Sequence, residues 1–405
     1  MRRPALPFLA CLALALAGGG CAHQAAEESV ALEENNAVFS FALQELQEKN
    51  EFAGAVTLVV GPDRIVALEA FGLADIASGR PMRKDSVFWI ASMTKPITSM
   101  GVLMLVEEGK LGLDDPVEKH LPSFKGQKLG TPQGPVAPPR PVTVRDLLTH
   151  TGGFSPAMPT AADRPVDTVP LAAMVDHTGR TPLVSAPGAK WAYSNTGMNT
   201  LGRLIEVVSG QPYAEFVQKR FLEPLDMNST GFWPDVTLQA SLATPYRKDK
   251  VTGELVAATN PRFSQPLQDR QRTALPAGGL FSTANDLAQL YQMILRGGEL
   301  DGHRFLKPET LQLMTTNQLG DLPKVSFAEG MRMGLGFHIV GTPVGVTESL
   351  SPGSFGHGGA YGTQAWIDPV RRRAYVLLIQ RTDLPNSDGS DIRREFQKAA
   401  TTLLK

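Results

Sequence analysis

Strand-like segments stand at both ends of this chain of 405 residues, whereas helical patterns fill the part between them. Near the start, the apolar runs 54–61 and 64–72 are separated by a Pro-Asp pair, a spacing typical of a β-hairpin. Strand patterns return in the segments 333–341, 359–369 and 374–381. This distribution predicts one sheet built from both ends of the chain, with a helical domain inserted between them.

The predicted fold class is α+β, with a largely antiparallel sheet flanked by helices. Three parts are expected: 1–21 as an export signal, 28–110 together with 330–405 as an α/β domain, and 111–329 as a mainly helical insertion. Helical patterns cover 30–49, the run from Ser92 to about Gly109, and 143–150, 198–210, 212–225, 282–298 and 390–405. The active cleft of such a chain is expected between its two domains.

The charge balance argues against a nucleic-acid partner. Lysine and arginine total 39 against 40 acidic residues, so there is no basic excess to neutralise phosphates. The seven histidines are scattered, and no two of them stand four residues apart on a helical pattern. The sequence therefore predicts neither a metal ion nor another cofactor.

The first residues have the pattern of an export signal. Arg2 and Arg3 precede the apolar stretch 8–17, which is too short for an ordinary membrane span. Small residues before Cys21 resemble the lipobox of bacterial lipoproteins, although Gly18 stands where that pattern usually has leucine. Lipidation of Cys21 and ordinary cleavage both remain open. We predict an exported protein, periplasmic or anchored to the outer membrane, with membrane contact only through a Cys21 lipid.

A serine and a lysine three residues apart, Ser92 and Lys95, stand where the apolar run 87–91 passes into a helical pattern. If Ser92 begins a helix, Lys95 lies one turn later on the same face, so that its ammonium group reaches the hydroxyl. Such a pair is expected about once by chance in a chain of this length, and it occurs once. It fits either a helix cap with a surface lysine or an activated nucleophile.

Two further sequence motifs favour the interpretation of Ser92 as an activated nucleophile. Tyr193 and Asn195 form a Tyr-x-Asn just before a helical pattern, and His357, Gly358 and Gly359 stand just ahead of a strand. Taken alone, a tyrosine is more often a core or interface residue, and Asn195 is also a good N-cap for the following helix. Each motif alone is a weak signal, but the three motifs in this order along the chain form a specific pattern.

With these motifs the sequence resembles the penicillin-recognising serine hydrolases, which include class C β-lactamases, D-alanyl-D-alanine peptidases and family VIII esterases. The segments LLTHTGG, LPAGGLFSTANDLA, GLGF and GAYGTQAWIDP are similar to this family too, the last one most to its esterase branch. The resemblance extends through almost the whole chain after the export signal. It implies a mixed sheet flanked by helices, together with a helical domain.

The resemblance also implies residue roles. Ser92 attacks the carbonyl carbon, Lys95 and Tyr193 accept and donate protons, and Asn195 holds both the substrate and Lys95. The third motif, His357, Gly358 and Gly359, contacts the substrate. The backbone N–H groups of Ser92 and Ala360 form the oxyanion hole.

The chemistry requires a base beside the serine, since a hydroxyl is a weak nucleophile. Lysine and tyrosine have ordinary pKa values near 10.4 and 10, so acting as a base at pH 7 requires a pKa lowered by about three, roughly 4 kcal/mol. Burial favours a neutral Lys95, and a positive Lys95 favours a Tyr193 phenolate. The sequence leaves open which of the two takes the proton.

The third motif favours esters as substrates. Relatives that act on β-lactams often carry Lys-Thr-Gly here, whereas a neutral His357 adds little charge and Gly358 has no hydroxyl. Both contacts to a substrate carboxylate are therefore weaker, although some peptidases of the family also use histidine here. Arg371–Arg373 fit a turn between strands better than a substrate-binding cation. We interpret His150 as structural, at the end of a helix beside a Gly-Gly turn.

The sequence thus predicts a serine hydrolase that acts through an acyl-enzyme on short-chain or small acyl esters. An alternative that uses the same catalytic residues is a β-lactamase or an amide hydrolase of the D-Ala-D-Ala carboxypeptidase or aminopeptidase type. An alternative of another class is an envelope lipoprotein that binds or senses peptidoglycan without catalysis. The only partner predicted is a small-molecule ester or amide, and the oligomeric state stays open.

Overall fold

The computed structural model of the chain describes residues 38–155, 164–320, 322 and 327–403. The predicted export signal and Cys21 lie outside these residues, so both stay predictions. Among the described residues, no helix has the length and apolar character that crossing a membrane requires.

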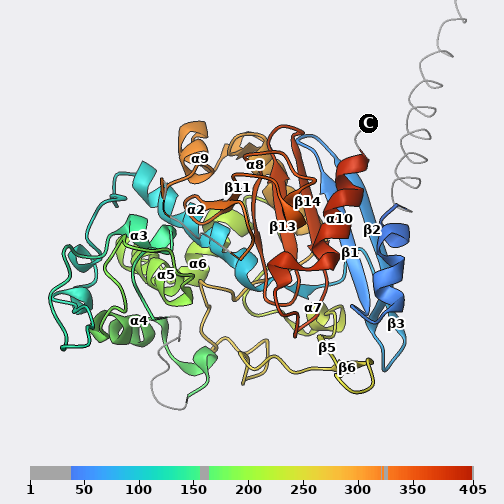
Figure 1. Cartoon of the computed structure of the whole chain (residues 1–405), viewed down its shortest axis with the longest axis horizontal. Coiled ribbons are helices and arrows are strands. Elements are labelled where there is room, and N and C mark those ends of the chain that lie inside the picture. The colour runs from blue at the N-terminus through green and yellow to red at the C-terminus, as the bar shows by residue number, and fades with distance from the viewer. Residues whose placement is uncertain (1–37, 156–163, 321, 323–326, 404–405) are drawn as a thin grey trace, which may run out of the picture.

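An eight-stranded sheet forms the centre of the molecule (Figure 1). Its strand order is β10-β11-β12-β13-β14-β1-β2-β3, so the first strands of the chain extend the sheet formed by the last ones. Each neighbouring pair is antiparallel, which confirms the α+β prediction and shows that the sheet is not mixed. The strands are β1 Gly54–Val60, β2 Ile65–Asp75, β3 Arg80–Pro81, β10 Met331–Met333, β11 His338–Val340, β12 Phe355–Gly358, β13 Gln364–Asp368 and β14 Arg373–Leu378.

Strand β1 lies between β14 and β2 and is buried along its whole length. Val56, Leu58 and Val60 belong to the core on one face of the sheet, whereas Ala55 and Val59 belong to the core on the other face. This alternation follows from the two-residue period of a strand. The continuous apolar run of β1 is explained by cores on both sides.

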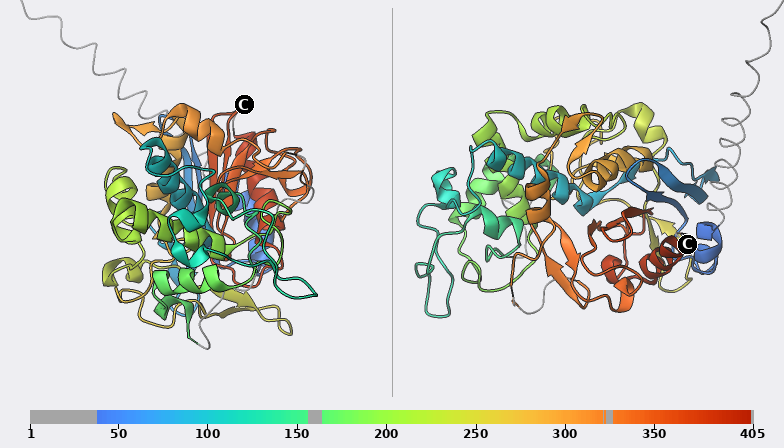
Figure 2. Two further views of the ribbon diagram at one scale, coloured as in Figure 1. Left: turned by 90° about the vertical axis from the view of Figure 1, so that its left-hand side faces the viewer. Right: turned by 90° about the horizontal axis from the view of Figure 1, so that it is seen from above.

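Helices cover both faces of the sheet (Figure 2). The helix at 38–48 and α10 (Asp391–Thr402) cover one face together, with the Phe39 and Phe396 rings 5.5 Å apart between centroids. On the other face, α8 (Ala284–Leu295) packs against β1 and β14. The two terminal segments therefore meet on the same side of the sheet.

A second group of helices lies beside the sheet, on the left in Figure 1. The central helix of the group is α5 (Asn195–Ser209), which packs against α2 (Thr94–Glu107), α3 (Val144–Leu148), α4 (Leu171–Arg180) and α6 (Tyr213–Val217). Helices predicted at 143–150, 198–210, 212–225 and 282–298 are confirmed as α3, α5, α6 and α8, with shifted ends. The segment 111–329 supplies α3, α4, α5 and α6 of this group as well as the sheet-covering α8, whereas α2 precedes it, and the status of the segment as a separate domain stays a prediction.

Short elements connect these layers. They are η1 Ala91–Met93, η2 Val117–Lys119, η3 Pro122–Phe124, η4 Val166–Thr168, η5 Gln218–Leu222, η6 Gly345–Thr347, η7 Ser387–Gly389, α7 Val236–Ala240, α9 Pro308–Met314, β4 Phe88–Trp89, β5 Tyr246–Lys248, β6 Leu255–Ala257, β7 Phe281–Ser282, β8 Glu299–Leu300 and β9 His303–Arg304. The pair of β4 with β7 leads directly into η1. It thereby places the start of α2 next to the segment 277–280.

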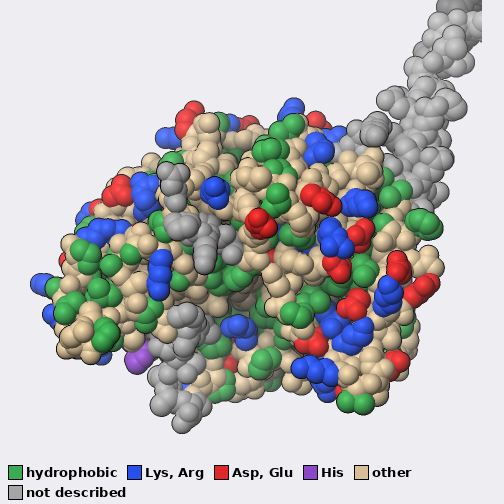
Figure 3. Space-filling view, viewed as in Figure 1, with side chains coloured by type: hydrophobic (Ala, Val, Ile, Leu, Met, Phe, Trp, Pro, Cys, Tyr) green, Lys and Arg blue, Asp and Glu red, His purple; other side chains and the backbone are tan. Residues whose placement is uncertain are grey.

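On the face of the molecule shown in Figure 3, basic side chains are spread over both halves and acidic side chains lie mostly in the right half, among the described residues. Binding to nucleic acid requires basic side chains gathered in a patch or stripe. The face shown therefore agrees with the charge balance of the sequence.

Candidate active site

Ser92 lies in the 3₁₀ turn η1, directly before α2. Met93 is the N-cap of α2, and neither cap residue of η1 or α2 makes a side-chain cap hydrogen bond, so the helix-cap interpretation of Ser92 is wrong. Ala91 has a φ of 46°, in the left-handed region that alanine rarely adopts. Thr94 Oγ1 donates to Ala91 O at 2.7 Å and helps to hold this conformation. Strain of this kind is concentrated at functional sites.

Lys95 and Tyr193 both contact the Ser92 hydroxyl. Lys95 Nζ lies 2.8 Å from Ser92 Oγ, and Tyr193 Oη donates to the same oxygen at 2.9 Å. Lys95 Nζ also donates to Ala277 O at 2.5 Å and lies 4.8 Å from the centroid of the Tyr193 ring. Residues 101 positions apart in the sequence therefore meet at one oxygen atom.

Burial favours one proton arrangement at this oxygen. It lowers the pKa of Lys95 well below the ordinary value, and the nearby Arg262 guanidinium lowers it further. Burial raises the pKa of Tyr193, against the effect of its hydrogen bond to Ser92. A neutral Lys95 amine donates to Ala277 O and keeps a lone pair that can accept the Ser92 proton. Of the two bases that the sequence left open, the structure favours Lys95.

Asn195 begins α5, but the N-cap of this helix is Ser194, whose hydroxyl accepts from Gly197 N at 2.9 Å. The alternative role of Asn195 as an N-cap is therefore wrong. Asn195 lines the same recess as Ser92, as a substrate-binding residue should. Within the described residues, no hydrogen bond joins Asn195 to Lys95, and Ala277 O holds the amine in its place.

Asn199, one turn later on α5, was not identified from the sequence. Its side chain is buried, and its Oδ1 accepts from Ala277 N at 3.1 Å. Because Ala277 O in turn accepts from Lys95, Asn199 positions the amine through the Ala277 peptide. The only signal in the sequence was its spacing of four residues from Asn195, which places both side chains on one face of the helix.

The third motif lies inside the sheet. His357 and Gly358 belong to β12 and Gly359 directly follows it. The strand predicted after them begins later, as β13 at Gln364, and the strand that contains His357 and Gly358 was not predicted. Gly356 pairs with His338 of β11, and Gly358 pairs with Gln364 of β13. Partners on both sides override the weak strand preference of a glycine-rich segment.

Gly359 brings the end of β12 close to the nucleophile turn. A Cβ at this position would lie 2.7 Å from Ile90 O and 3.3 Å from Ala91 Cβ, so a larger residue would push the two segments apart. The next residue, Ala360, lines the recess with Ser92, and its N–H has no hydrogen-bond partner within the described part of the chain. This N–H is available to an oxyanion, although the predicted oxyanion hole stays a prediction.

Three buried histidines surround the Tyr193 ring. The centroid distances from Tyr193 are 4.8 Å to His150, 6.1 Å to His357 and 6.5 Å to His338. Burial lowers the pKa of all three, to about 4 for His338. His357 is therefore neutral, as expected, with Nδ1 at 2.7 Å from Gly358 O. No group of three or more possible ligand side chains in the described chain is arranged to hold a metal ion.

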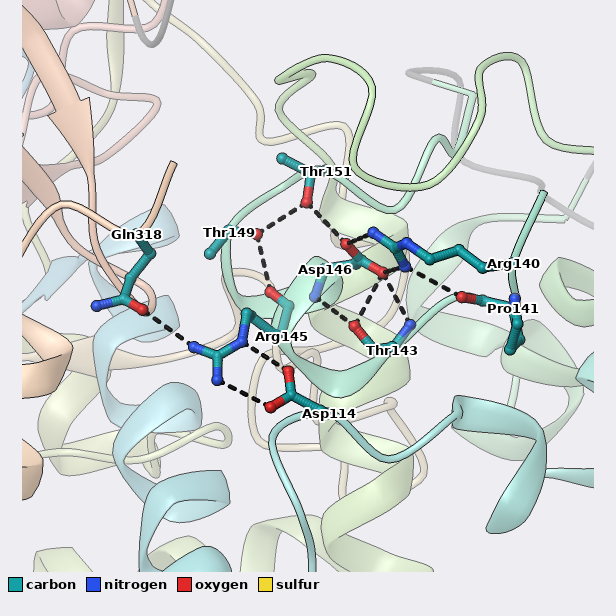
Figure 4. A network of polar contacts seen from close by, with 9 residues as sticks. All are labelled: Asp114, Arg140, Pro141, Thr143, Arg145, Asp146, Thr149, Thr151 and Gln318. Atoms are coloured by element: carbon teal, nitrogen blue, oxygen red, sulfur yellow. Dashed lines mark hydrogen bonds and ion pairs between the residues drawn. The ribbon is translucent and has the colours of Figure 1, made fainter. Parts of the chain in front are cut away.

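His150, which we interpreted as structural, lies beside the candidate site. Its Nδ1 accepts from Ser194 N at 3.3 Å, next to Tyr193. Figure 4 shows the polar network that holds this turn: Thr151 Oγ1 donates to Asp146 Oδ1 at 3.1 Å, and Arg140 forms an ion pair with Asp146. The network fixes His150, and His150 in turn supports the segment that carries Tyr193.

A recess of about 350 Å³, its open mouth included, lies beside Ser92. Most of this volume is open to solvent, so the enclosed part of the recess is much smaller than a typical ligand pocket. Among its lining residues are Asn195, Ala360 and Arg262, a cation that stood in an unremarked polar segment of the sequence. Arg371 and Arg372 lie in the predicted turn between β13 and β14, where Arg371 pairs with Asp368, and Arg373 begins β14.

Comparison with known proteins agrees with this geometry. A model of the Beta-lactamase family matches residues 40–400. Protein Rv1367c of Mycobacterium tuberculosis is 32% identical over 366 residues, which cover 84% of this chain and 88% of that protein. Esterase EstB of Burkholderia gladioli is 30% identical over 379 residues, covering 87% and 91%.

Solved structures show the same fold. EstCE1, described as a hydrolase with promiscuous acyltransferase activity, matches with a TM-score of 0.77 at 23% identity, covering 92% of this chain and 100% of that one. The family match spans the sheet, the helices beside it and every residue that meets at the Ser92 hydroxyl. The chain therefore belongs to the β-lactamase family of serine hydrolases.

Proposed function

We propose that this protein cleaves small carboxylic esters through an acyl-enzyme formed on Ser92. The observation that carries the proposal is the Ser92 hydroxyl held between the buried Lys95 amine and the Tyr193 hydroxyl. The two contacts leave the hydroxyl with a proton acceptor on one side and a donor on the other. This is the arrangement that an activated serine requires.

The reaction follows from these positions. Ser92 Oγ attacks the ester carbonyl carbon while its proton passes to neutral Lys95 Nζ, and the N–H groups of Ser92 and Ala360 stabilise the oxyanion. When the bond to the alcohol breaks, the leaving oxygen takes a proton from the Lys95–Tyr193 pair. Water then attacks the acyl-enzyme and gives one proton to the same pair. The bond between Ser92 Oγ and the acyl carbon breaks, the pair returns the proton to Ser92 Oγ, and the acid is released.

The third motif supports esters over substrates that need a carboxylate contact. His357 is buried and neutral, so it supplies no cation. Gly358 supplies no hydroxyl, and a larger side chain there would crowd Asp388, because a Cβ would lie 2.0 Å from Asp388 Oδ1. A negative Asp388 beside this motif also repels a substrate carboxylate. EstB, 30% identical to this chain, is named an esterase, which supports the same class.

The test compares kcat/KM of the protein for p-nitrophenyl butyrate, nitrocefin and a D-Ala-D-Ala peptide. Charge-assisted hydrogen bonds contribute roughly 1.5 to 3 kcal/mol each, so two poor carboxylate contacts should favour the ester by about 10² to 10⁴. Preference for nitrocefin or the peptide would overturn the esterase assignment and leave the serine mechanism intact. A protein that a fluorophosphonate does not label at Ser92 would instead be the non-catalytic peptidoglycan-binding alternative.

A further inference from the structure

The recess beside Ser92 contains a cation to which the proposed mechanism assigns no contact with the substrate. Arg262 is half-buried and lines the recess together with Ser92, Asn195 and Ala360. Within the described residues, its guanidinium has no ion-pair partner and donates no hydrogen bond. Charged groups withdrawn from water are normally paired. An unpaired guanidinium facing the nucleophile is therefore a candidate binding group.

The neighbouring arginines have other roles. Arg272 is buried, donates to Phe232 O at 2.7 Å and to Leu267 O at 2.5 Å, and so holds the loop together. Arg270 is exposed and lies over the Trp233 ring, 5.4 Å from its centroid. Neither of them lines the recess, so Arg262 is the one of these three arginines that lies beside Ser92.

The backbone that carries Arg262 is held in place by contacts of the next two residues, Phe263 and Ser264. The buried Asp167 carboxylate accepts from Ser264 N and from Ser264 Oγ, each at 2.8 Å. The Phe263 ring lies 5.4 Å from the Trp89 ring, and Trp89 itself lines the recess. These contacts fix the loop against the site, so the position of Arg262 is set by the fold.

The surroundings of Arg262 are basic. A second hollow shares Arg262 and Ala360 with the recess and is also lined by Arg247, which has a long ion pair of 3.8 Å with Asp249. None of the described residues that line the two hollows is acidic. The negative Asp388 lies instead beside Gly358, which does not line either hollow. An anion is thus attracted to one side of Ser92 and repelled from the other.

The position of Tyr193 separates the two halves of a substrate. The leaving alcohol must lie near Tyr193, because its oxygen takes a proton from the Lys95–Tyr193 pair. Tyr193 does not line the recess that contains Arg262. In this mechanism the acyl chain of the ester would face the recess, with its far end towards the Arg262 guanidinium.

We propose that Arg262 is a specificity-determining residue that binds a carboxylate at the far end of the acyl chain. The preferred substrates are then half-esters of short dicarboxylic acids. The proposal rests on the proposed esterase function and deepens it by naming the substrate class. A guanidinium suits this role because it presents paired N–H donors to a carboxylate.

A matched pair of esters tests the proposal. The p-nitrophenyl monoester of adipic acid and p-nitrophenyl hexanoate have equal chain length and differ in the terminal carboxylate. The ratio of their kcat/KM values, corrected for spontaneous hydrolysis, should favour the adipate in the wild type. In Arg262→Ala this ratio should fall roughly 10- to 100-fold, mainly through KM. Arg262→Lys should keep part of the ratio, and the matched control Arg270→Ala should keep all of it.

The outcomes separate this proposal from the esterase function. An unchanged ratio in Arg262→Ala, or an equal fall in Arg270→Ala, would overturn the assignment of Arg262. With 4-carboxyphenyl hexanoate the carboxylate moves to the alcohol; if only that ester responds to Arg262→Ala, the acyl-side placement is wrong. If the wild type hydrolyses none of these esters, the esterase function itself fails.

Discussion

The two sides of the Ser92 hydroxyl differ in their basic side chains. On the Tyr193 side, Lys95 and three histidines are buried, and burial lowers the pKa of each of these groups. On the recess side, the half-buried Arg262 presents a guanidinium group with paired N–H donors. One side is thus suited to proton transfer and the other to binding an anion.

The choice of residue type follows from this difference. A lysine changes its pKa readily on burial and can become a base, whereas an arginine stays charged and donates in a fixed planar geometry. The charge of Arg262 also lowers the pKa of Lys95, so the binding side assists the base side. The comparison predicts that an arginine in place of Lys95 removes the base, whereas a lysine in place of Arg262 weakens anion binding without abolishing it.

The largest effects on activity are expected at Ser92 and at the two groups that contact its hydroxyl. Lys95→Arg keeps the positive charge but supplies no lone pair, so it should lower kcat for p-nitrophenyl butyrate about as much as Lys95→Ala, by roughly 100-fold or more. Tyr193→Phe should lower kcat by a similar factor. Ser92→Ala should abolish both turnover and fluorophosphonate labelling. Stopped-flow acylation rates measure the loss, and thermal unfolding checks the fold. Substantial activity in Lys95→Arg would remove the neutral amine from the mechanism.

A smaller effect concerns stability in acid. The pKa of His338 is about 4 in the folded protein against 6.5 ordinarily, so the unfolded chain binds more protons below pH 6.5. The contribution is present above pH 6.5 and is lost as the pH falls towards 4, about 3 kcal/mol for this residue. His150 and His357 shift in the same direction.

Urea unfolding at pH 7 and pH 4.5 measures this loss. His338→Phe removes the titrating group from the same apolar surroundings and should reduce the difference in unfolding free energy between the two pH values. The control is His177→Gln, at an exposed position on α4, which should leave the difference unchanged. Equal pH dependence in wild type and His338→Phe would show that other groups govern acid unfolding.

The motifs were readable from the sequence because their chemistry depends on residue type and order. Ser92 and Lys95 are one helical turn apart, so their contact follows from local geometry. Tyr193 could be joined to them only through the family resemblance, since its contact spans 101 residues. The hairpin of β1 with β2 was predicted for the same local reason.

Arg262 and Asn199 could not be found in the same way. Both act through partners that are distant in the sequence: Asn199 through the Ala277 peptide, and Arg262 through a loop that Asp167 anchors. The strand position of His357 was also missed, because it depends on pairing with two other strands. Contacts of this kind are set by tertiary packing, which single-residue preferences do not encode.

The smallest effect tests the side of the site that repels anions. Gly358→Thr would supply the hydroxyl of a Lys-Thr-Gly motif, but its Cβ would meet Asp388 Oδ1 and Gln364 Nε2 at 2.0 and 2.5 Å. Both atoms end flexible side chains, so we expect accommodation at a cost of about 1 to 3 kcal/mol in stability. The β-lactam kcat/KM should stay low, because Asp388 remains negative beside the new hydroxyl.

Adding Asp388→Ala should relieve both the crowding and the repulsion. The double variant should recover stability in urea unfolding and have a higher kcat/KM for nitrocefin than Gly358→Thr alone. A Gly358→Thr variant that hydrolyses nitrocefin well with Asp388 in place would show that the missing hydroxyl, and not the acidic neighbour, limits β-lactam use.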